Sequence, residues 1–287
     1  MTSEESAKLR LRPLALADTD DAINLLVEGF PRRSPKYWRN TMERLWNLDR
    51  ASEVPHPGYV IDVRGKVVGI ILVVASAVQS RGRSPRANLS SWYVKPDYRS
   101  FATLLLSRAC KEKGVTYLNI SAAKHTHKIC EALGFKRYSQ GQFLGIPLLT
   151  KSDKQTLIEE IDLKSPLLGA ETQTMMSDHL GYGCICLVGK RDGALEPFIL
   201  VKRRVKGMLP VAQLIYCNSN AAYASFAGAI GRYLARIGIF FVIMDASGHE
   251  PGLWGLYFPE KTPKMFKGPN APRQNDLAYS EIAVFGI

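Results

Sequence analysis

The stretch Val94–Gly114, VKPDYRSFATLLLSRACKEKG, has the residue order of a strand end, a tight loop and a helix. The first amides of a helix have no partner within the helix and carry a partial positive charge, so they can bind phosphate without any side chain. Such loops usually contain glycines, and this one has none. Ala102 is nevertheless small, and Ser100 and Thr103 carry hydroxyl donors. We therefore predict that unpaired amides leading into a helix over 101–110 bind a diphosphate; the alternative is an ordinary strand-to-helix turn.

The elements that must position this loop follow from the hydrophobic pattern of the first half of the chain. It predicts the order β-α-α-β-β-β-α-β-α-β, a largely antiparallel sheet that ends in a β-α-β unit. The helix over 34–48 is expected to begin at Ser34-Pro35, because Ser is a frequent N-cap and Pro suits the first helical turn. Arg64-Gly65-Lys66 is expected to form the turn of a hairpin.

The second half repeats part of this order. The pattern predicts three strands between 181 and 219, a helix over 220–238 and a buried strand over 239–246, which is β-β-β-α-β again. The residues themselves show no convincing identity between the halves. We expect two domains, 1–150 and 151–287, from an ancient duplication or a pseudo-repeat.

Two segments of the first domain resemble the core of the GCN5-related N-acetyltransferase (GNAT) superfamily. The family has a strand ending in V-x-P-x-Y-R before its phosphate loop, and a short helix ending in Y-E-x-L-G-F before its last strand. The matching residues are Val94, Pro96, Tyr98, Arg99, Leu105 and Leu106 in the first segment, and Glu131, Leu133, Gly134 and Phe135 in the second. The resemblance implies an α/β (α+β) fold with a mixed central sheet flanked by helices, in two tandem GNAT-like units of which the second is degenerate.

The resemblance also implies a cofactor, acetyl-CoA or another acyl-CoA, held by the strand end and the loop. Two glycine positions of the family become Ala102 and Leu104 here, and the branched Leu104 side chain would crowd a phosphate. The implied cofactor-binding residues are Trp92, Tyr93, Val94, Arg99, Ser100, Phe101, Ala102, Thr103 and Leu104.

In this family an amine or hydroxyl acceptor attacks the thioester directly, which calls for a base, an oxyanion donor and an acid. A backbone amide around Trp92–Val94 is the implied oxyanion donor. Cys130 stands where the family has a tyrosine that protonates the leaving thiolate; the alternative is a small buried hydrophobe. The strand that often carries the family's glutamate base offers Ser90 instead, which is no base, and His127 is the candidate that could reach the cleft or simply be a satisfied surface residue.

The charge of the chain constrains its partners. The net charge is +12, and residues 1–150 hold 23 Lys and Arg against 13 Asp and Glu, a net charge of +10. A basic half favours an acidic partner. Two alternatives to the acyl-CoA enzyme therefore remain open: a transferase whose donor is an acidic acyl carrier protein or an aminoacyl-tRNA, and a non-catalytic acyl-CoA-binding or scaffold module.

Composition bounds the remaining possibilities. The start of the chain has no apolar core typical of a secretory signal, and no apolar run is long enough for a membrane span. Five cysteines at uneven spacing favour free thiols and a cytoplasmic location. We expect no metal site, because Cys184-x-Cys186 places both thiols on one strand face and His125-x-His127 lacks a third ligand.

Overall fold

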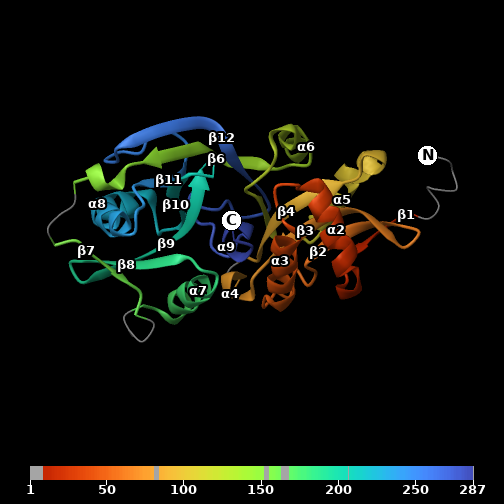
Figure 1. The fold of residues 1–287 in the computed structure, drawn as a ribbon, viewed down its shortest axis with the longest axis horizontal. Coiled ribbons are helices and arrows are strands. Elements are labelled where there is room, and N and C mark those ends of the chain that lie inside the picture. The colour runs from red at the N-terminus through yellow and green to blue at the C-terminus, as the bar shows by residue number, and fades with distance from the viewer. Residues whose placement is uncertain (1–8, 81–83, 152–154, 163–167, 206, 287) are drawn as a thin grey trace. The chain divides into compact units, whose positions relative to one another are not determined.

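The structure is a computed structural model that describes residues 9–80, 84–151, 155–162, 168–205 and 207–286 (Figure 1). The chain forms two compact units. Unit 1 comprises Met1–Lys136 and Phe266–Asn270, and unit 2 comprises Arg137–Met265 and Ala271–Ile287. None of the described helices is long and apolar enough to cross a membrane.

Unit 1 is built on a mixed sheet with the strand order β1-β2-β3-β4-β5. Neighbouring strands are antiparallel from β1 to β4, and β4 and β5 are parallel. The strands are β1 (Leu9–Pro13), β2 (Gly58–Val63), β3 (Lys66–Val74), β4 (Arg86–Val94) and β5 (Thr116–Asn119). The helices are α2 (Thr19–Gly29), α3 (Pro35–Asn47), α4 (Ala77–Ser80), α5 (Ala102–Ala109) and α6 (His127–Ala132).

Local sequence signals set these elements. The Ser34 side chain accepts a hydrogen bond from the Tyr37 amide at 3.2 Å, with Pro35 in the first turn, so the predicted start of α3 is confirmed. Arg64 and Gly65 both have positive φ, 54° and 82°, as the tight turn between β2 and β3 requires.

Unit 2 repeats the order of unit 1. Strands β8, β9 and β10 are antiparallel, α8 follows, and β11 is parallel to β10. The sheet order is β12-β6-β11-β10-β9-β8-β7. The strands are β6 (Lys136–Gly145), β7 (Leu157–Glu160), β8 (Ile185–Arg191), β9 (Ala194–Val205), β10 (Leu209–Tyr216), β11 (Phe241–Ala246) and β12 (Gly255–Lys267), and the helices are α7 (Ala170–Gly181), α8 (Asn220–Arg236) and α9 (Glu281–Val284).

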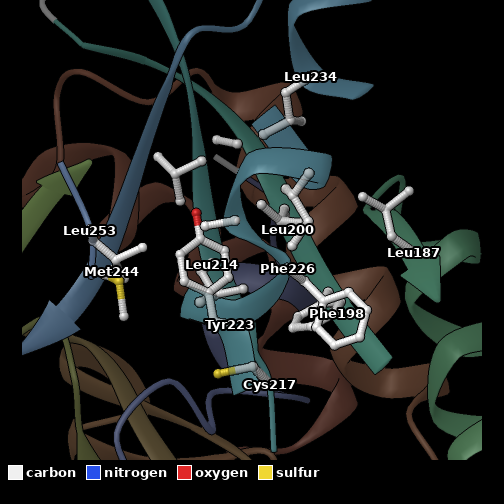
Figure 2. Close-up of a cluster of buried hydrophobic side chains, with 14 of the residues drawn as sticks. Leu187, Phe198, Leu200, Leu214, Cys217, Tyr223, Phe226, Leu234, Met244 and Leu253 are labelled. Atoms are coloured by element: carbon white, nitrogen blue, oxygen red, sulfur yellow. The ribbon is translucent and has the colours of Figure 1, made fainter. Parts of the chain in front are cut away.

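The core of unit 2 lies between α8 and the sheet (Figure 2). Tyr223 and Phe226 of α8 pack with Phe198 of β9, with ring centroids 6.3 and 5.5 Å from Phe198. On α8, Gly231 permits a close approach, because a Cβ there would lie 2.4 Å from the backbone nitrogen of Leu148. Small residues on this helix therefore serve packing within unit 2.

The observed architecture confirms the predicted mixed sheet flanked by helices and the tandem repeat of β-β-β-α-β. The two compact units divide after Lys136, so the rest of β6 belongs to unit 2, whereas the predicted boundary is residue 150. Residues 255–267 form the long strand β12.

Candidate active site at the divergence of β4 and β5

The site is defined by the point where β4 and β5 part. Their pairing runs from Arg86–Thr116 to Asn88–Leu118. Beyond Asn88, β4 continues to Val94 and stays paired with β3. Parallel strands that separate in this way leave backbone groups of β4 available to a ligand that enters between them.

A β-bulge lies in this free part of β4. Ser90 pairs with Leu72 and Tyr93 with Ile70, so β4 holds one residue more than β3 over the same span. Ser91, in the bulge, has a φ of 52°. A non-glycine residue in the left-handed region is uncommon in a strand and re-aims the neighbouring amides. The bulge therefore falls at the place predicted for the oxyanion donor, around Trp92.

Two buried polar side chains of β4 have no hydrogen-bond partner among the described residues. The Asn88 side chain is fully buried, and neither its amide nitrogen nor its oxygen is bonded. The indole Nε1 of Trp92 is likewise buried and unbonded. Buried polar groups nearly always find partners, and each orphan costs roughly 1–3 kcal/mol. These orphaned groups fit a ligand that carries hydrogen-bonding groups, such as the amides of pantetheine.

The structure brings two of the three predicted catalytic residues together on α6. His127 and Cys130 lie three positions apart and therefore on one face of the helix. The His127 Nε2 donates to the Ala122 carbonyl at 3.3 Å, so Nδ1 is the ring nitrogen that this bond leaves available. The Cys130 Sγ accepts from the amide of Asn119, the last residue of β5, at 3.4 Å. This bond leaves the Cys130 S–H free to donate.

The third predicted catalytic residue, Ser90, lies on β4 next to the bulge. It is buried, and its hydroxyl oxygen is 3.1 Å from that of Ser91. Cys130 is also fully buried, and burial raises the pKa of its thiol. The thiol is therefore protonated at neutral pH.

The loop predicted to bind phosphate has a tighter form than the sequence predicts. Residues Pro96–Phe101 form a 3-10 helix that runs directly into α5. In it the Tyr98 amide donates to the Lys95 carbonyl at 2.9 Å, and the Ala102 amide donates to the Arg99 carbonyl. The expectation that the amides leading into α5 are all unpaired is therefore wrong for Ala102, because in a 3-10 helix an amide donates to the carbonyl three residues before it.

Polar side chains are exposed at this end of α5. Arg99, Ser100 and Thr103 are exposed, so one cationic group and two hydroxyls are available to an anion. Leu104 is 52% exposed and Phe101 half-buried. The Leu104 side chain therefore points into solvent and does not fill the β4–β5 divergence.

The side chains of two predicted cofactor-binding residues are engaged in contacts within unit 1. Val94 is buried in the core of unit 1. Tyr93 donates to Glu28 Oε1 at 3.0 Å, and its ring covers Gly29, where a Cβ would lie 2.4 Å from Tyr93 Cγ. Lys95 and then Tyr93 hold the pKa of the Glu28 carboxyl below its usual value. Only the backbone of Tyr93 and Val94 is left for a cofactor.

Sequence reasoning missed two residues of the site, Asn119 and Glu28. The sequence signal for Asn119 was a polar residue at the end of an apolar strand, and polar residues are common at strand ends. Glu28 was missed because α2 and β4 are distant in sequence. Among the described residues, no group of three His, Cys, Asp or Glu side chains could hold a metal ion.

Comparisons with known proteins find similarity in structure and not in sequence. No protein-family model and no curated protein matches the sequence. Solved structures do match. A GCN5-related N-acetyltransferase from Anabaena variabilis is 14% identical, with 90% of this chain and 72% of that chain covered and a TM-score of 0.60.

Two further structures give the same result. An N-acetyltransferase of this kind from Kribbella flavida is 14% identical over 91% of this chain and 71% of its own, with a TM-score of 0.55. One from Sphaerobacter thermophilus is 11% identical over 92% and 98%, with a TM-score of 0.50. The similarity extends over both units and not over the first alone. The chain therefore has the fold of the GCN5-related N-acetyltransferases.

Proposed function

We propose that the protein is an acyltransferase that moves an acetyl or longer acyl group from a CoA thioester to an amine or hydroxyl acceptor by direct attack, in unit 1. One observation carries the proposal. The bulge of β4 and the orphaned Asn88 side chain lie together where β4 leaves β5. Bound acyl-CoA would supply the thioester carbonyl.

Each of these residues at the β4–β5 divergence then has a proposed role. The amides of the bulge around Trp92 stabilise negative charge on the carbonyl oxygen. The buried amide of Asn88 receives the hydrogen bonds that it lacks. Ser90 and Ser91 present hydroxyls to the acceptor side.

His127 acts as the general base in this scheme. The Ala122 carbonyl fixes its tautomer through Nε2, and Nδ1 is left to accept the proton of the acceptor. Cys130 donates its proton to the leaving thiolate. Burial raises the pKa of the Cys130 thiol, so Cys130 holds its proton until negative charge develops on the leaving sulfur. Asn119 positions Cys130 without taking its proton.

Arg99, Ser100 and Thr103 bind the diphosphate. A guanidinium and two hydroxyls replace part of what a glycine loop provides through its amides. The comparisons lend no support to an acyl carrier protein or a tRNA as donor, and we do not propose either.

The test combines binding with turnover. Thermal shift with CoA should stabilise the wild type, and Arg99→Glu should lose at least about tenfold in affinity because a favourable charge becomes a repulsive one. Arg64→Glu is the matched control, since it makes the same change on an exposed hairpin turn of unit 1. Labelled acetyl-CoA with a panel of amines and alcohols then measures transfer. Binding without any transfer would favour a non-catalytic module, and no CoA binding would refute the proposal.

A further inference from the structure

Unit 2 contains the same kind of divergence as unit 1. Strands β10 and β11 are parallel from Val211–Phe241 to Gln213–Ile243. Beyond Ile243, β11 stays paired with β6 as far as Ala246 and leaves β10. The end of β10 and the end of β11 therefore separate as β4 and β5 do.

The bulge recurs as well. Leu214 of β10 pairs with Leu200, and Tyr216 pairs with Ile199, so Ile215 is an extra residue in β10. Unit 2 thus has a bulged strand, a parallel partner that leaves it, and a helix, α8, between the two in sequence. In unit 1 the same features form the proposed cofactor slot, which lies where the ends of β4 and β5 separate.

In unit 2 the slot is filled by the chain itself. The Leu277 amide donates to the Ile215 carbonyl at 2.7 Å, and the Cys217 amide donates to the Asn275 carbonyl at 3.2 Å. Tyr216 and Asp276 form an antiparallel bridge. Residues 275–277 therefore add a short strand to the free edge of β10.

On the other side, the Asn275 side chain takes the place of a strand backbone. Its oxygen accepts from the Asp245 amide at 2.7 Å, and its nitrogen donates to the Asp245 carbonyl at 3.0 Å. A carboxamide has the same donor and acceptor groups as a peptide. Asn275 is fully buried, so its amide is satisfied where that of Asn88 in unit 1 is not.

The start of α8 is occupied by the same segment. The Asn220 amide donates to Gln274 at 3.2 Å and to Glu250 at 3.0 Å, and its oxygen accepts from Asn275 at 2.8 Å. At this place unit 1 has the exposed cation Arg99 near the start of α5. A carboxylate at the start of α8 would repel a diphosphate.

We propose that residues 273–277 are an internal replacement for the cofactor in unit 2, which closes the second slot and leaves one acyl-CoA site per chain. The segment supplies the hydrogen bonds that pantetheine would make. Its cation, Arg273, is engaged by the Cys217 and Asn218 carbonyls and by Asp276 at 3.5 Å, and Glu250 adds a carboxylate at the start of α8. The identity of the ligand rests on the proposed function of unit 1. The closure of the slot does not depend on that function, because it follows from contacts within unit 2.

Two measurements on the full chain test the proposal. The first is a calorimetric titration with CoA, in which one equivalent should bind. The second is amide hydrogen exchange with and without CoA. In the free protein, the amides of Cys217, Asp245 and Leu277 should exchange at least about 100-fold more slowly than exposed loop amides. Added CoA should slow exchange in 86–104 and leave 211–246 unchanged.

A variant sharpens the second measurement. Asn275→Ala removes the bonds to Asp245 and Asn220, so exchange of the Asp245 amide should accelerate by about tenfold or more. The affinity of unit 1 for CoA should stay within about twofold, because Asn275 lies in unit 2.

The outcomes separate the two proposals. Two equivalents of CoA, or protection of 211–246 by CoA, would overturn the internal replacement while leaving the proposed function intact. If no CoA binds, the proposed function fails and the exchange rates in the free protein decide: slow exchange at Cys217, Asp245 and Leu277 supports the replacement, and fast exchange overturns it.

Discussion

The Asn119 side-chain amide donates to the Cys130 sulfur at 3.4 Å and so ties the last residue of β5 to α6. The bond uses a lone pair of the sulfur and leaves the thiol hydrogen in place. A buried thiol held in this way is available as a proton donor at the end of the β4–β5 divergence.

Cys130→Ala should lower kcat by about 10- to 100-fold with acetyl-CoA, because the thiolate must then leave without a proton donor. With an aryl thioester as donor, whose thiolate leaves readily, the loss should shrink to less than about threefold. Steady-state rates with both donors measure the difference. Cys110→Ala makes the same change at another thiol of unit 1 and should leave both rates unchanged. An equal loss with both donors would show that Cys130 acts on structure and not on the leaving group.

His127→Gln should lower kcat/KM by about 100-fold, since the acceptor loses its general base. Steady-state kinetics of the wild type and the variant with the same acceptor measure the loss. The control is His125→Gln, which alters an exposed imidazole just before α6. An unchanged kcat/KM in the His127 variant would exclude His127 as the general base.

Asn88→Leu should raise the free energy of unfolding by about 1–2 kcal/mol, because an unpaired buried amide is replaced by an apolar group of similar size. Acyl transfer should fall at least tenfold in the same variant. Asn275→Leu is the comparison, and it should lower the free energy of unfolding by about 2–4 kcal/mol, because there the amide is fully bonded and the backbone, at a φ of 55°, lies in a region that leucine disfavours. Urea unfolding measures both values. Destabilisation by Asn88→Leu would show that Asn88 has partners in the free protein.

The stability of unit 2 should depend on pH through His179. Its Nδ1 donates to the Met175 carbonyl at 2.6 Å, and its Nε2 accepts from the Tyr279 amide at 3.1 Å, so the buried ring is neutral. Burial lowers the pKa of His179 from 6.5 to about 4. Between these values the unfolded chain binds a proton that the folded chain does not, and stability therefore falls as the pH drops from 6.5 towards 4.

Urea unfolding at pH 7 and pH 5 measures this effect. The wild type should lose about 2 kcal/mol from this group over that interval. His179→Gln should be less stable at pH 7 but should lose about 2 kcal/mol less between the two pH values. An equal pH dependence in both proteins would exclude His179 as the source.

Sequence patterns predicted the elements whose signals are local. The Ser34-Pro35 start of α3 and the turn at Gly65 depend on residues within a few positions of one another. The parallel joining of β4 to β5 through α5 follows from the β-α-β order together with the family resemblance. These features required no information about distant contacts.

The remaining features depend on contacts that no local pattern encodes. The long strand β12 carries Pro259 and Pro263, which disfavour a strand in any local reading, and is held by its neighbour β6. The bulge at Ser91 has no glycine to mark it. Asn275 lies 30 positions from Asp245 in sequence, so its insertion beside β11 was not predictable.

The route of the chain has a consequence for synthesis on the ribosome. Unit 1 is completed by residues 266–270, and the Asn270 side chain donates to Ser84 at 2.7 Å. Unit 1 therefore cannot complete its folding when residues 1–136 emerge, and must wait until residues 266–270 have been translated. A gene truncated at codon 150 would encode a fragment in which unit 1 lacks residues 266–270.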